Sequence, residues 1–226
     1  MTSRLRLLLL TLLGGWMPIE LPAQSDVLGN WMMYFGQGRL SDDFSLHTEA
    51  QYRHHTVAPN IEQLLLRTGL RYHVAPTATL LMGYGFISSH EPDKGIGDPL
   101  TTEHRIYQEL TLNQSVGRIN FEHRYRVEQR WVNGDYRNRF RYRLFANMPL
   151  NRPKLEADTW FLAVYDEVFI APTGNVFDRN RIYGALGYKV DSAFNAQVGV
   201  LNQQVGTVPK WYLQFAVFVS PDFRKK

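Results

Sequence analysis

Arginine and glutamate recur at every second position over two long stretches of this sequence. Between Arg118 and Trp131 the alternate positions are Glu122, Arg124, Arg126, Glu128 and Arg130. Between Tyr136 and Met148 they are Arg137, Arg139, Arg141 and Arg143. Guanidinium groups pair with carboxylates through two parallel hydrogen bonds and stay charged at any working pH. The spacing therefore predicts a ladder of ion pairs between neighbouring strands, with carboxylates separating the arginines.

Histidines and one acidic turn are the other candidates for chemistry. His54 and His55 are adjacent, so in an extended segment they point apart, and none of the seven histidines has a helical metal spacing. Residues 90–93 offer His, Glu and Asp as loop ligands, a composition that hydrated loops commonly have. Residues 41–43, Ser-Asp-Asp, are explained better by a turn than by paired catalytic carboxylates. We expect no catalytic residue, no metal site and no cofactor.

Alternation of apolar and polar residues runs through most of the chain and predicts β-strands, since side chains alternate between the two faces of a strand. About eleven strands are expected, many of them about ten residues long, the length with which a tilted strand crosses a bilayer. Their approximate ranges are 30–37, 44–53, 66–74, 79–87, 103–114, 118–131, 136–148, 155–170, 179–190, 194–204 and 211–220.

The polarity of the two faces favours a membrane barrel over a soluble sandwich. A sandwich also alternates, with its apolar face in the core. Here the polar face carries rows of Arg and Glu, and a closed barrel is the one sheet that satisfies all its backbone groups in lipid. We expect an all-β, antiparallel transmembrane β-barrel of about 10–12 strands. Its lumen would be lined by Glu49, Arg67, Arg71, Glu103, Arg105, Glu109, Glu122, Arg124, Arg126, Glu128, Arg130, Arg139, Arg141, Arg143, Glu167 and Arg181.

The connections are predicted to alternate in length. Short turns are expected at 75–77, 115–117, 151–154 and 191–192, and longer loops at 54–60, 88–102 and 171–178. Outer-membrane barrels have short periplasmic turns and longer outer loops. With that orientation, ten strands from residue 44 onward close with both ends in the periplasm. The strand at 30–37 is then left over, and either pairs within a twelve-stranded barrel or enters the lumen.

The first residues are typical of an export signal. Arg4 and Arg6 precede a short apolar segment, and Ala23 supplies a small residue before the expected cleavage. We therefore expect a signal peptide over residues 1–23, removed by cleavage near Ala23, and a single domain over 24–226. The chain has no cysteine, which excludes disulfides and thiolate metal sites, and its net charge of +4 does not indicate nucleic-acid binding.

Several of these charged segments resemble an uncharacterised bacterial family, the domain of unknown function 2490 (DUF2490). The segments are Glu103-His104-Arg105, residues 124–130, 139–144, 165–169 and 177–181, with Trp31 and residues 49–53 near the start. The resemblance covers nearly all of the chain after the signal peptide. It implies an outer-membrane barrel and no established activity.

Three functions follow from these features. The first is a non-enzymatic barrel in the outer membrane of a Gram-negative bacterium, whose lumen is either structural or a small pore. The second is an outer-membrane enzyme acting on lipid or peptide at the loop rim, and the third is a soluble periplasmic ligand-binding barrel. The expected partners are outer-membrane lipid and, during insertion, the barrel-assembly machinery. No nucleic acid is expected, and a small solute or ligand is not identified by the sequence.

Overall fold

The computed structural model describes residues 28–57, 60–173 and 176–224. The predicted signal peptide and its cleavage point near Ala23 lie outside these residues. Within them, no helix is long and apolar enough to cross a membrane. The strands are β1 (Gly29–Arg39), β2 (Phe44–His54), β3 (Ile61–Ala75), β4 (Ala78–Ser89), β5 (Thr101–Val116), β6 (Ile119–Val132), β7 (Asp135–Pro149), β8 (Thr159–Ile170), β9 (Phe177–Lys189), β10 (Phe194–Val205) and β11 (Val208–Val219).

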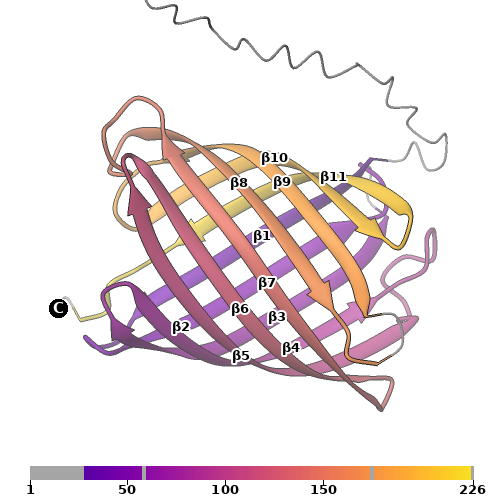
Figure 1. Cartoon of the computed structure of the whole chain (residues 1–226). Coiled ribbons are helices and arrows are strands. Elements are labelled where there is room, and N and C mark those ends of the chain that lie inside the picture. The colour runs from indigo at the N-terminus through magenta and orange to yellow at the C-terminus, as the bar shows by residue number, and fades with distance from the viewer. Residues whose placement is uncertain (1–27, 58–59, 174–175, 225–226) are drawn as a thin grey trace, which may run out of the picture.

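The strands form one closed barrel in which each strand pairs with its neighbours in sequence and β1 pairs with β11. The tilted strands enclose a single interior (Figure 1). The prediction of an all-β barrel of about 10–12 strands is confirmed. Ten of the strand pairs are antiparallel, as expected, whereas β1 and β11 are parallel.

The place of the first strand differs from both alternatives that the sequence left open. Residues 29–39 neither enter the lumen nor pair with a twelfth strand among the described residues. Instead β1 completes the wall, pairing over Asn30–Arg39 with β2 and over Gly29–Gly36 with β11. The physical reason is closure: an odd number of strands in an up-and-down order brings the first and last strands together in the same direction.

The odd strand number also places the beginning of β1 and the end of β11 at opposite ends of the barrel (Figure 1). We call these the N-terminal end, where β1 begins, and the C-terminal end, where β11 finishes. Connections at the C-terminal end span residues 40–43, 76–77, 117–118, 150–158 and 190–193. Those at the N-terminal end span 55–60, 90–100, 133–134, 171–176 and 206–207.

The alternation of loop lengths is less regular than predicted. Residues 133–134 and 206–207 are two-residue turns at the end that carries the longer loops. Asn133 and Gly134 both have positive φ, the conformation that two-residue hairpins require. The turn after β7 is longer than expected, because β8 begins at Thr159. Asn151 bridges this turn, donating to the carbonyl of Asp158 at 3.0 Å and accepting from the N–H of Trp160 at 2.8 Å. Leu155, predicted to lie in a strand, instead packs on the interior cluster.

The two faces of the wall have opposite character. Large apolar side chains lie exposed on the outer face of all eleven strands, for example Met82 on β4 and Val164 on β8. The inner face carries most of the arginines and glutamates on β2, β3 and β5 to β7, while β8 to β11 and β1 supply the buried apolar cluster, with Glu167 on β8 and Arg181 on β9 as buried charges. The interior therefore has an ionic half and an apolar half.

Candidate functional site: the charged interior of the barrel

The structure places all sixteen predicted lumen residues on the inner face of the wall, each of them buried or half-buried. They come from seven of the eleven strands, β2, β3 and β5 to β9, and none lies on β4. The period of two positions them, since every inward arginine or glutamate is followed one residue later by an outward side chain. Arg137, on the same face of β7 by spacing, does not join them: it lies exposed at the strand end, 3.8 Å from Asp135.

Glu128, at the centre of this network, is completely buried. Its Oε2 accepts hydrogen bonds from Arg139 Nε at 2.9 Å and Nη2 at 2.7 Å, and its Oε1 accepts one from Arg141 Nη1 at 2.8 Å. Arg105 and Arg126 also lie within ion-pair distance, at 3.8 and 3.7 Å. Four guanidinium groups thus surround one carboxylate, an arrangement that a dry site tolerates only when the other charges are balanced nearby.

Two further glutamates balance those charges across the interior. Glu167 on β8 accepts from Arg141 on β7 at 2.7 Å and from Arg124 on β6 at 2.5 Å. Glu109 on β5 accepts from Arg126 on the adjacent strand at 2.6 Å. It also contacts Arg71 on β3 at 3.4 Å. The pairs Arg124–Glu167 and Arg71–Glu109 each skip one strand, so the side chains reach over the inner surface rather than only to their neighbours.

The remaining glutamates of the ladder pair with arginines on their own or an adjacent strand. Toward the N-terminal end, Glu103 accepts from Arg105 and from Arg130, both through Nε at 2.5 Å. On β2, Glu49 accepts from Arg67 at 2.8 Å. Toward the C-terminal end, Glu122 accepts from Arg143 at 2.5 Å. Glu103, Glu109, Glu128 and Glu167 with their arginines make one connected network in the middle and the N-terminal part of the lumen. Glu49–Arg67 and Glu122–Arg143 are separate ion pairs beside it.

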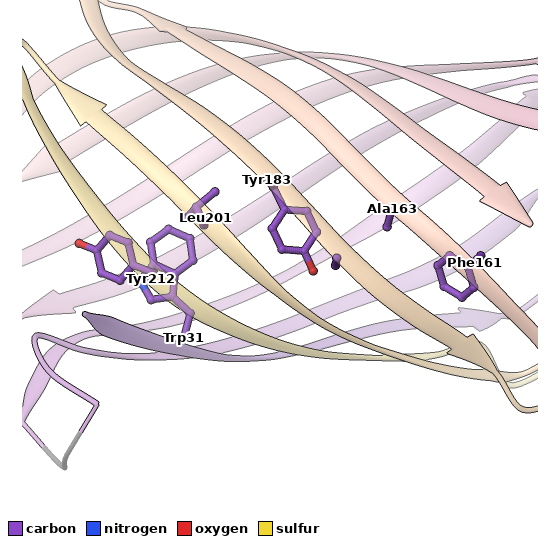
Figure 2. Close-up of a cluster of buried hydrophobic side chains, with 7 residues drawn as sticks. Trp31, Phe161, Ala163, Tyr183, Leu201 and Tyr212 are labelled. Carbon is purple, nitrogen blue, oxygen red and sulfur yellow. The ribbon is translucent and has the colours of Figure 1, made fainter. Parts of the chain in front are cut away.

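The apolar half of the interior is a second component, which the sequence did not predict. Its cluster contains Trp31, Phe161, Ala163, Tyr183, Ala185, Leu201 and Tyr212 (Figure 2). Trp31 joins the two halves, since the guanidinium groups of Arg53 and Arg181 lie 3.9 and 4.9 Å from its ring centroid. Such contacts stabilise cations that are removed from water.

The reason these residues were missed lies in the pattern of β8 to β11. On β8 both the inward Phe161 and Ala163 and the outward Leu162 and Val164 are apolar, so the alternation that marks a lumen face is lost. A continuous apolar run bounded by turns was the available signal, and it indicates a strand buried on both faces. Arg53 and Asp178 were also missed; Asp178 lies 3.2 Å from Arg139.

A cavity of about 290 Å³ lies between the two halves. It extends from Arg141 and Glu167 in the middle of the barrel to Gln37 and Ser220 at the C-terminal end. The ionic network closes it toward the N-terminal end, where Glu128 and Arg139 are buried. The described interior is thus hollow on one side and filled on the other.

The other chemical candidates have local partners. Asp93 accepts a hydrogen bond from Asn60 at 2.9 Å, and Glu91 pairs with Lys94 at 2.5 Å. Ser41 Oγ accepts from the N–H groups of Asp43 and Phe44, as in a turn. Over the described ranges, the structure contains no group of three or more His, Cys, Asp or Glu residues that could hold a metal ion.

Comparison with known proteins supplies a family but no activity. A family model described as a protein of unknown function, DUF2490, matches residues 28–214. An uncharacterised protein of Methylorubrum extorquens is 29% identical over 177 residues, which is 73% of this chain and 73% of that protein. No solved structure matches the chain.

Proposed function

Because this chain belongs to the DUF2490 family, for which no activity is described, we propose its function from the polarity of its barrel. We propose that it is a non-enzymatic β-barrel of the bacterial outer membrane, whose ion-paired lumen is structural rather than a pore. The proposal includes export with a signal peptide over residues 1–23, outer-membrane lipid as the surrounding solvent, and insertion by the barrel-assembly machinery.

The observation that carries this proposal is the inverted polarity of the wall. A soluble barrel packs apolar side chains inside and presents charge to water. Here Glu128, Arg126 and Glu167 are buried inside, whereas Met82 is 62% exposed and Ile182 57% exposed on the outside. Exposed apolar surface of this extent normally marks a contact with lipid or another protein. We propose lipid as that contact because a bilayer would cover the exposed apolar side chains of all eleven strands at once.

Aromatic side chains near both ends of the barrel support a membrane. At the C-terminal end, Phe44 packs against Tyr72 with ring centroids 5.2 Å apart, and Trp160 lies close to Tyr188 at 4.8 Å. At the N-terminal end, Trp131 packs against Tyr136 at 5.3 Å. Aromatic girdles of this kind flank the apolar band of transmembrane barrels.

The filled N-terminal part of the lumen supports a structural role over conduction. Arginines and glutamates there form ion pairs with one another, and Glu128 and Arg105 are at most 5% exposed. A path for solutes would require these buried pairs to separate. The odd strand count departs from the even number usual in single-chain bacterial barrels. The parallel β1–β11 pair still leaves no open sheet edge, which is the requirement that lipid imposes.

Fractionation tests the location. The mature chain is expected in the outer-membrane fraction, from which only detergent extracts it. It is also expected to migrate faster on a gel before boiling than after boiling. Recovery from the soluble periplasm without detergent would contradict the membrane proposal and favour a periplasmic ligand-binding barrel.

Two assays on the purified protein in lipid test the structural role of the lumen and the non-enzymatic assignment. Planar bilayers containing the protein are expected to show no single-channel conductance, because the ionic network fills the lumen. A steady, anion-biased conductance would overturn the structural role in favour of a pore. Turnover of added phospholipid or peptide by the same preparation would contradict the non-enzymatic assignment.

A further inference from the structure

We propose that the cavity at the C-terminal end of the barrel binds a single-chain amphiphile with an anionic head group, of which a medium-chain carboxylate is the simplest example. The inference depends only on the interior of the barrel and goes beyond the proposed function, which assigns no ligand. Three features carry it: an excess of arginine, unused hydrogen-bond donors, and an apolar wall opposite them.

The excess of positive charge is concentrated on β6 and β7. In the register of these strands, Arg124 lies directly opposite Arg143, and Arg126 lies opposite Arg141. Like charges in cross-strand pairs are destabilising unless anions lie between them. Around the cavity as a whole, seven arginines face four glutamates among the described residues. The protein therefore does not neutralise this wall by itself.

The rung closest to the C-terminal end retains donors that nothing in the described chain uses. Arg124 gives Nη2 to Glu167 and Arg143 gives Nη2 to Glu122, both at 2.5 Å. The Nε atoms of both arginines are buried without a hydrogen-bond partner among the described residues, and Glu109 is 3.8 Å from the Arg124 Nε. An unmet buried donor costs free energy until an acceptor arrives.

Two arginines deeper in the same lining have the same property. Arg67 and Arg126 are 7% and 3% exposed, and Arg67 Nε and Arg126 Nη1 have no hydrogen-bond partner among the described residues. Both side chains line the cavity. Carboxylate oxygens accept charge-assisted hydrogen bonds from such groups. These four arginines form the cationic side of the cavity, and an anion at the Arg124–Arg143 rung would balance part of their excess charge.

The opposite wall of the cavity accounts for the apolar part of the ligand. Met33, Phe35, Phe161 and Ala216 line it from β1, β8 and β11. Phe145 lies beside the cationic rung itself, with the guanidinium of Arg143 5.2 Å from its ring centroid. A free inorganic anion would leave this surface uncovered. The volume of about 290 Å³ is near the lower limit of small-molecule sites, which suits one short chain rather than a diacyl lipid.

Equilibrium dialysis with four probes tests the proposal on the full mature chain in phosphatidylcholine nanodiscs, with empty nanodiscs as the blank. Decanoate is expected to bind saturably at one site. Decanol lacks the anion, acetate lacks the chain, and decyltrimethylammonium reverses the charge, so each is expected to bind at least about tenfold more weakly. Equal binding by decanol or by acetate would refute the amphiphile, and so would absence of decanoate binding.

A matched pair of variants locates the site. Arg143→Gln removes one member of the cationic rung and is expected to weaken decanoate binding about tenfold or more. Arg130→Gln removes an arginine of similar exposure whose partner is Glu103, on the far side of the ionic network, and is expected to leave binding unchanged. Equal effects of the two variants would show that binding is not at this rung. If Arg143→Gln does not fold, Arg143→Lys, which keeps the charge, takes its place. The four-probe comparison on the wild type still decides whether the cavity binds an anionic amphiphile. The two binding tests are separate from the fractionation and conductance assays. The ligand proposal can therefore fail while the proposed function stands, and the proposed function can fail while the ligand proposal stands.

Discussion

Replacing Glu128 by glutamine tests whether the interior of this barrel is dry. The substitution keeps the size of the side chain but removes the negative charge that four arginines share. Arg139 would keep Asp178 at 3.2 Å and Arg141 would keep Glu167 at 2.7 Å. Each would nevertheless lose its contact with the central carboxylate, which is completely buried.

The magnitude follows from burial. Removing one partner of a fully buried ion pair costs about 3–5 kcal/mol, because the other charge is left without compensation. Since the surrounding arginines retain second carboxylates, we expect about 3 kcal/mol, the lower end of that range. Glu122→Gln is the matched control: Glu122 has one partner, Arg143, and its side chain is 30% exposed. A partly solvated pair contributes about 0–1 kcal/mol.

The assay is urea unfolding of the refolded protein in lipid vesicles, followed by tryptophan fluorescence and by the heat-dependent gel shift. The difference between the two variants is the decisive quantity. A loss at Glu128 no larger than the loss at Glu122 would refute a dry, structural network and indicate a hydrated lumen.

Three further predictions concern the wall and its orientation. Leu144→Arg, on the outer face near the middle of β7, is expected to cost about 2–4 kcal/mol in lipid, and folding as stable as that of the wild type would reject the lipid-facing assignment. Gly83→Ala would place a Cβ 2.5 Å from a tyrosine ring on β5, so we expect a loss of about 1–3 kcal/mol by urea unfolding. At Gly184 a Cβ would meet nothing within 4 Å, so Gly184→Ala is expected to be nearly neutral, and equal losses would contradict the packing. Because the chain has no cysteine, Asp98→Cys and Ser192→Cys report on opposite ends of the barrel. An impermeant maleimide is expected to label only Asp98→Cys on intact cells; labelling of Ser192→Cys alone would reverse the orientation.

The strands and the direction of their charged faces were accessible from the sequence, because both depend on neighbours two residues apart. Alternation on β6 and β7 identifies Glu128 and Arg141 as one face before any pairing is known. Backbone sterics fix that alternation in any extended strand. The same local rule predicted the outer positions, such as Met82 and Tyr84 on β4, which the structure leaves exposed.

Where both faces of a strand are apolar, alternation does not predict which face points into the barrel. Phe161 and Leu162 look equivalent in the sequence, but Phe161 is buried in the interior and Leu162 is exposed outside. The apolar half of the lumen, and with it the cavity, could therefore not be predicted from the alternation of the ladder.

Alternation along the chain is enough to predict about eleven strands with arginine and glutamate on one face. It does not predict which charges meet, and the closed barrel pairs Arg124 with Glu167 across β7 and Arg71 with Glu109 across β4. Nor does alternation predict that β1 closes the wall parallel to β11. The physical reason is that alternation is set within one strand, whereas partners across the interior depend on strand number, register and curvature together, and these are fixed only when the barrel closes.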